Sequence, residues 1–61
     1  MEIGSMFISN EHPWINVAII EVLDNDMVLL SCFNMWSLNQ SKMYIHVPRL
    51  LQTYTKSYYI I

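Results

Sequence analysis

Charged residues are scarce in this chain. Of its 61 residues, three are lysine or arginine and five are aspartate or glutamate, so the formal net charge is −2. Three basic residues are few for a protein that binds nucleic acid, because the affinity for nucleic acid scales with the number of phosphates neutralised. Hydrophobic residues make up 54% of the chain. With so little charge to cover them, we expect an exposed apolar patch or a second subunit that covers it, the alternative being that small proteins simply expose more apolar area.

Cysteine occurs once, at position 32. A single cysteine forms no intramolecular disulfide and no thiolate metal site. Small domains in oxidising compartments usually carry several disulfides, so this count favours the reducing cytoplasm. Cys32 lies inside an apolar run, where we expect a buried and inert thiol.

The chain also has no uninterrupted apolar stretch of the length that a membrane span requires. Residues 17–33 come closest but contain Glu21, Asp24 and Asp26, which are costly to insert into a bilayer. Residues 1–5 contain no basic segment followed by an apolar stretch, so we expect no signal peptide. These observations predict a cytoplasmic protein without a membrane span.

Two apolar runs, residues 14–23 and 27–33, flank Asp24, Asn25 and Asp26. Runs rich in β-branched and aromatic residues around a short polar turn predict a long β-hairpin. A helix is the competing interpretation of the first run, but its β-branched residues and the lack of a cap favour a strand. Because both faces of the hairpin are apolar, we expect burial on more than one side.

Shorter elements precede and follow this hairpin. Residues 6–8 predict a first strand that ends at the polar turn 10–13. Residues 43–47 alternate between apolar and polar side chains, which is typical of a half-buried strand with Tyr44 and His46 on its polar face.

Pro48 ends that strand and suits the first turn of a helix. A single helical turn here would place Leu50, Leu51 and Tyr54 on one side. Residues 57–61 predict the last strand.

Five strands with one helical turn between the fourth and the fifth resemble the small SH3-like barrels. The resemblance depends on the hairpin, residues 43–47, the turn 48–54 and residues 58–61. It implies an all-β, five-stranded SH3-like barrel that forms a single domain over residues 1–61. The chain lacks the acidic first loop and the paired tryptophans of signalling SH3 domains, so a proline-peptide groove is not implied.

The chain also looks like the SH3-like small proteins that tailed phages encode in their accessory regions. Its usage of Asn, Ile, Lys, Met and Tyr is similar to that of an AT-rich phage genome.

No pattern in the chain is typical of catalysis or of metal binding. His12 and His46 lie far apart in the sequence with no carboxylate pattern nearby, so we expect surface histidines. The acidic tripeptide 24–26 resembles the start of a calcium loop, but the apolar residues that follow supply no further ligands. No elbow or local signature surrounds the serines or Cys32. We therefore predict no enzyme, no cofactor and no metal.

Charge and aromatic residues give an alternative function. All five acidic residues lie within the first 26 positions, and the basic residues Lys42, Arg49 and Lys56 come later, interleaved with tyrosines. Basic residues among aromatics are typical of platforms for single-stranded nucleic acid. The negative net charge makes this nucleic-acid-binding regulator the second interpretation.

Trp14 and Trp36 bracket the open end of the hairpin. If Asp24 lies opposite Asp26, this register places Trp14 opposite Trp36, and we expect one of them in the core and the other in an interface.

The first interpretation is a non-enzymatic protein-binding module, encoded by a phage, that binds and modulates or inhibits a host or phage protein. A homodimer through an edge strand or the aromatic residues is compatible with it. The candidate partner-binding residues are Trp14, Phe33, Trp36, Tyr44, Tyr58 and Tyr59.

Overall fold

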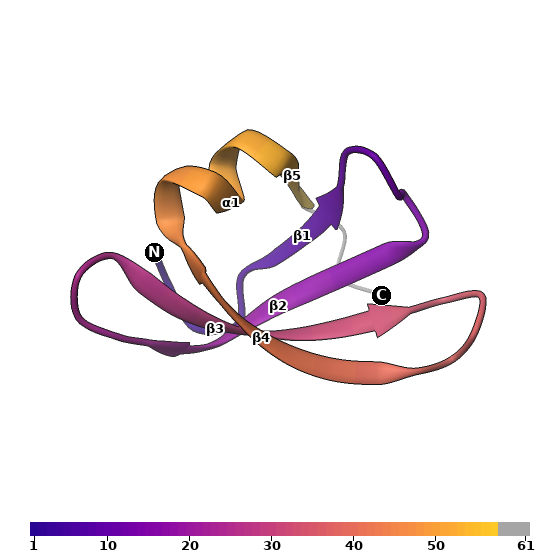
Figure 1. Cartoon of the computed structure of the whole chain (residues 1–61), viewed down its shortest axis with the longest axis horizontal. Helices are drawn as coiled ribbons and strands as arrows, with labels where there is room; N and C mark the ends of the chain where they lie inside the picture. The colour runs from indigo at the N-terminus through magenta and orange to yellow at the C-terminus, as the bar shows by residue number, and fades with distance from the viewer. Residues whose placement is uncertain (58–61) are drawn as a thin grey trace.

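The structure is a computed structural model that describes residues 1–57, and these form one antiparallel sheet with a short helix (Figure 1). The elements are β1 (Met6–Ser9), β2 (Ile15–Val22), β3 (Met27–Asn34), β4 (Gln40–His46), α1 (Val47–Thr53) and β5 (Tyr54–Ser57). The strand order is β4-β3-β2-β1-β5. The predicted all-β fold, with five strands and a short helix before the last one, is confirmed.

The sheet is open. β4 and β5 are its two edges, and within residues 1–57 no ladder joins them. α1 connects these edges in sequence and contacts both of them, on one side of the sheet (Figure 1). β5 has four described residues, all paired with β1, so the predicted closed barrel is not confirmed.

The hairpin of β2 and β3 is confirmed. Asn25 and Asp26 have φ angles of 60° and 58°, and two successive positive φ angles are the signature of a type I′ hairpin turn. Asparagine and aspartate tolerate this left-handed conformation better than other side chains do. The backbone N–H of Leu23 donates to the carbonyl oxygen of Met27 at 2.8 Å and closes the turn.

A β-bulge interrupts this hairpin at Ile20. Ile19 pairs with Leu30 whereas Glu21 pairs with Leu29, so Ile20 has no partner of its own. The bulge shifts the register by one residue toward the open end of the hairpin. As a result the backbone N–H of Met35, and not that of Trp36, donates to the carbonyl oxygen of Trp14, at 2.9 Å. The predicted backbone pairing of Trp14 with Trp36 is therefore wrong by one position.

The core lies on one face of the sheet. Its fully or nearly fully buried side chains are Phe7, Val17, Ile19, Val28, Leu30 and Leu50. The strand residues in this set follow the alternation of side chains along a strand. The opposite face is open within residues 1–57 of the single chain, with Ile20 exposed at 38%, so burial of the hairpin on more than one side stays a prediction that would need a second molecule.

The helix contributes one residue to this core. Pro48 lies in its first turn, and Leu50 is buried while Leu51 is 58% exposed. Neighbours on a helix point about 100° apart, so only one of the two leucines faces the sheet. Tyr54 has extended backbone angles and begins β5. The predicted common side for Leu50, Leu51 and Tyr54 is therefore wrong.

The last strand begins earlier than residue 57, and the rest of its predicted range, residues 58–61, lies outside the described residues. Within the described part of the chain, no helix has the length and hydropathy that crossing a membrane requires.

Candidate functional site

The connection between β3 and β4 is a compact loop held by Asn34. The Oδ1 atom of Asn34 accepts hydrogen bonds from the backbone N–H groups of Trp36, at 2.9 Å, and Ser37, at 3.1 Å. The carbonyl oxygen of Asn34 accepts from the N–H of Leu38 at 2.8 Å, and its own N–H donates to Asn39 at 2.9 Å. Asparagine side chains that bond to the backbone just after them stabilise such turns. Asn34 therefore anchors the path of the loop.

Trp36 projects from this loop and stacks on Trp14. The two ring centroids are 4.1 Å apart, and the ring planes differ by 6°. The ring of His12 lies against Trp14, with 5.1 Å between centroids and a tilt of 54°. Trp14 covers one face of the Trp36 ring, yet Trp36 as a whole remains 75% exposed. Neither tryptophan belongs to the buried core, so the prediction of one core tryptophan is wrong.

Two further apolar residues of the same loop are exposed. Met35 is exposed, with its sulfur 2.9 Å from the amide nitrogen of Asn16, and Leu38 is 72% exposed. Leu38 has a φ of 61°, a left-handed conformation that costs a non-glycine residue about 1–2 kcal/mol. A strained backbone that presents an apolar side chain to solvent favours a functional role over a stabilising one. We call Trp14, Met35, Trp36 and Leu38 the aromatic end.

The other predicted partner-binding residues lie outside the aromatic end. Phe33 and Tyr44 are exposed on the face of the sheet that points away from α1, which we call the outer face. Tyr58 and Tyr59 lie outside the described residues. Sequence reasoning missed Met35 and Leu38. The available signal was the presence of apolar residues on both sides of Trp36 within a turn, where polar residues are usual.

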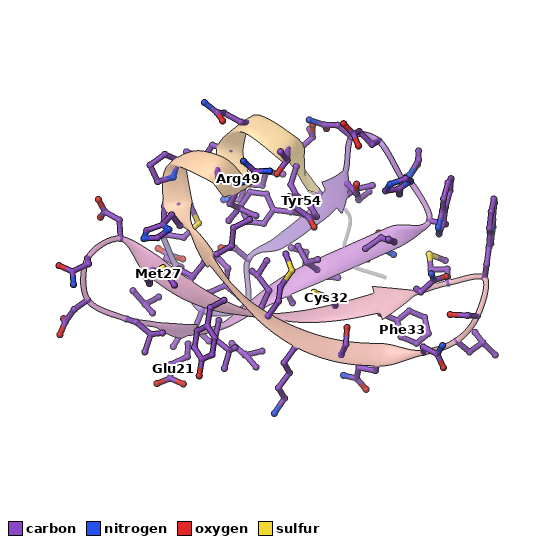
Figure 2. All side chains as sticks on the ribbon, viewed as in Figure 1. Glu21, Met27, Cys32, Phe33, Arg49 and Tyr54 are labelled. Carbon is purple, nitrogen blue, oxygen red and sulfur yellow. The ribbon has the colours of Figure 1, made fainter. Side chains whose placement is uncertain are left out.

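The basic residues do not form one patch. Lys42 pairs with Ser31 on the outer face, since the neighbouring pair of Met43 and Leu30 points to the core. Arg49 lies on α1, beside Tyr54 on the opposite side of the sheet (Figure 2). Lys56 lies in β5. Because the sheet separates Lys42 from Arg49, the basic residues do not form the single nucleic-acid-binding surface that the second interpretation predicts.

A hollow of about 290 Å³ lies beside Arg49, with His12, Glu11 and Tyr54 among its lining residues. Within residues 1–57, no three histidine, cysteine, aspartate or glutamate side chains come together in a way that could hold a metal ion. The aromatic end is thus the most distinctive arrangement of side chains in the described part of the chain.

Cys32 packs against the core from β3 and is half-buried, not buried as predicted. Burial raises the pKa of its thiol. The pKa of Tyr54 is raised by burial and, to a smaller extent, by the charge of a Cys32 thiolate. A raised pKa leaves less of the reactive thiolate at neutral pH, the direction expected for an inert thiol.

We expect the free energy of unfolding to fall as the pH rises into the alkaline range. The raised pKa means that the folded protein keeps the Cys32 proton at a pH where the unfolded chain has released it, so high pH favours unfolding. Urea-unfolding midpoints between about pH 7 and pH 10 measure this fall, since these values bracket the titration of cysteine. The Cys32→Ala variant should show a smaller fall. Equal pH dependence of the two proteins would contradict this role of Cys32.

No protein-family profile, curated protein or solved structure matches this chain. A functional inference therefore depends on the geometry of the aromatic end. The resemblance to small SH3-like barrels stays a prediction from the sequence.

Proposed function

We propose that this chain is a non-enzymatic protein-binding module that inserts Trp36 into an apolar pocket of a partner protein. One observation carries the proposal: Trp36 is 75% exposed, yet its backbone is held by Asn34 and its ring by Trp14. Tryptophan is enriched among the residues that dominate protein–protein binding energy. A side chain that is already held loses less conformational entropy on binding, so more of its burial contributes to affinity.

The chemistry around Trp36 favours a protein partner over a nucleic acid. Residues 33–41 contain no charged side chain. Depletion of charge around an aromatic anchor is typical of the centre of a protein interface. Phosphate binding needs basic residues close together, and Lys42 and Arg49 lie on different sides of the sheet.

The proposal also concerns the source of the protein and the compartment in which it acts. We propose a phage-encoded protein that acts in the host cytoplasm and modulates or inhibits a host or phage protein by occupying its surface. The support for it is the resemblance to small phage proteins that the sequence predicts, in the order of its elements and in its residue usage. Inhibition of this kind needs an anchor residue but no catalytic group.

The test compares Trp36→Ser with Leu51→Ser. Both remove an exposed apolar side chain, one from the aromatic end and one from α1. A partner captured from host lysate by the tagged wild-type chain is purified, and its Kd is measured for each variant. We expect Trp36→Ser to weaken binding by about 30-fold or more, the effect of losing a dominant contact residue, and Leu51→Ser to change it by less than about twofold.

The Asn34→Ala variant is a second test in the same binding experiment. It keeps Trp36 but removes the side-chain oxygen that accepts hydrogen bonds from the loop backbone. We expect an intermediate loss of affinity, with circular dichroism confirming that each variant is folded. A partner that binds Trp36→Ser as tightly as wild type would overturn the proposal, as would the absence of any stoichiometric protein partner. Recovery of nucleic acid whose binding falls steeply with salt and with Lys42→Ala would replace it by the second interpretation.

A further inference from the structure

The outer face of the sheet carries several apolar side chains among polar ones and, within residues 1–57, no helix or further strand packs on it. It extends over β1, β2, β3 and β4, and Figure 1 shows α1 on the other side of the sheet. Its apolar residues are Met6, Ile8, Ala18, Ile20, Leu29, Phe33 and Tyr44. Tyr44 is the most exposed of these, at 62%. Exposed apolar side chains gathered on one face in this way often mark an interaction surface.

An acidic and a basic side chain lie on this face, on either side of β3. Glu21 on β2 shares a row with Leu29, and Lys42 on β4 shares a row with Ser31. Figure 2 shows Glu21 on the side of the sheet away from α1. Two strand spacings across and two residues along separate their Cα atoms by roughly 12 Å, which is too far for an ion pair within the chain. Neither is in an ion pair with another residue among positions 1–57.

This diagonal placement makes the outer face complementary to itself. A two-fold axis parallel to the face, passing over β3 between Leu29 and Ser31, exchanges the positions of Glu21 and Lys42. When a second copy packs on the face around such an axis, each Glu21 meets the partner's Lys42, and Leu29 on β3 lies between the two pairs. We propose that the outer face is a homodimer interface in which two sheets pack face to face with these two reciprocal ion pairs.

The small area of the outer face indicates a weak dimer. β2, β3 and β4 have eight, eight and seven residues. At about 3.4 Å per residue and about 4.8 Å between strands, their flat footprint is roughly 390 Å² per copy. This is below the roughly 800 Å² per partner of a standard interface, even if β1 adds to it. We therefore expect a reversible dimer with a Kd in the range of about 1–100 μM.

Reversal of each charge tests the reciprocal pairing. In Glu21→Lys, lysines at positions 21 and 42 face each other twice in the dimer, and in Lys42→Glu two glutamates do so. Like charges across an interface are strongly unfavourable, so we expect each variant alone to dimerise at least about tenfold more weakly than wild type. An equimolar mixture of the two variants carries only opposite charges across the axis and should regain dimerisation as a heterodimer. Sedimentation velocity across the micromolar range measures all three samples.

Two further variants separate this interface from the aromatic end. Tyr44→Ser should weaken the dimer by about tenfold or more, because Tyr44 is the most exposed apolar side chain of the face and lies beside Leu29, next to the two-fold axis. Trp36→Ser should leave the dimer unchanged. A wild-type chain that is monomeric up to about 1 mM, or a mixture that dimerises no better than the separate variants, would overturn the proposal. If Trp36 proves not to bind a partner protein, the proposed function fails, but the sedimentation measurements of the dimer are unaffected.

Discussion

The Leu50→Ala variant is expected to lose about 2–5 kcal/mol of its free energy of unfolding. Leu50 is completely buried, and it is the residue through which α1 enters the core of the described chain. Its truncation leaves a cavity between the helix and the buried residues of the sheet. A domain of this size has a total stability of roughly 3–9 kcal/mol, so the loss removes a large fraction of it.

Leu51→Ala is the matched control. It makes the same chemical change one residue further along the same helix, where the side chain is 58% exposed. Helix propensity changes equally in both variants, so burial accounts for the difference between them. We expect Leu51→Ala to change stability by less than about 0.5 kcal/mol. Urea unfolding followed by circular dichroism measures both, and similar losses would contradict the packing of α1 through Leu50.

The Ile19→Ala variant is also expected to lose about 2–5 kcal/mol, and Ile20→Ala much less. Ile19 is completely buried opposite Leu30, whereas Ile20 is the unpaired residue of the bulge and faces outward. Without the bulge, the register set by the turn would pair Ile20 with Leu30 and turn Ile19 outward. Two identical side chains in sequence are thus distinguished by one irregularity in the ladder.

Urea unfolding of these two variants therefore tests the bulge itself. A larger loss for Ile20→Ala than for Ile19→Ala would show that the ladder is regular and that the assignment of faces is reversed. The dimer gives the opposite ranking, because Ile20 lies on the outer face. Ile20→Ala should weaken dimerisation while leaving the urea midpoint close to that of wild type.

Local chemistry explains the parts of the fold that the sequence predicts well. Asp24, Asn25 and Asp26 form a turn that needs positive φ angles, and the runs on both sides of it form the expected hairpin. The alternation in residues 43–47 places Met43 and Ile45 toward the core, and Tyr44 outward. These features depend on neighbours in sequence, which a single chain displays directly.

The errors arise where long-range geometry decides between equivalent residues. Nothing local distinguishes Ile19 from Ile20, or Leu50 from Leu51, until the register and the position of the helix are fixed. The same applies to closure of the sheet, which depends on how the two edges approach each other.

The candidate site was predictable in part. The symmetry of the hairpin brings Trp14 and Trp36 together, and their rings do stack. Phe33 and Tyr44 belong to the same predicted set of contact residues, but side chains on β3 and β4 alternate between faces, and this directs both residues to the outer face. Leu38 was missed because turns normally carry polar residues, and its left-handed backbone becomes visible only in the folded chain.

The stacked indoles give the protein a built-in optical reporter. Trp14 and Trp36 are the two tryptophans of the chain, and both lie in the one stack. Their emission and their coupled ultraviolet transitions therefore originate at a single place on the molecule, without dilution by indoles elsewhere. A ligand that covers Trp36 or separates the rings changes that signal directly, so occupancy can be followed in real time on the unlabelled chain.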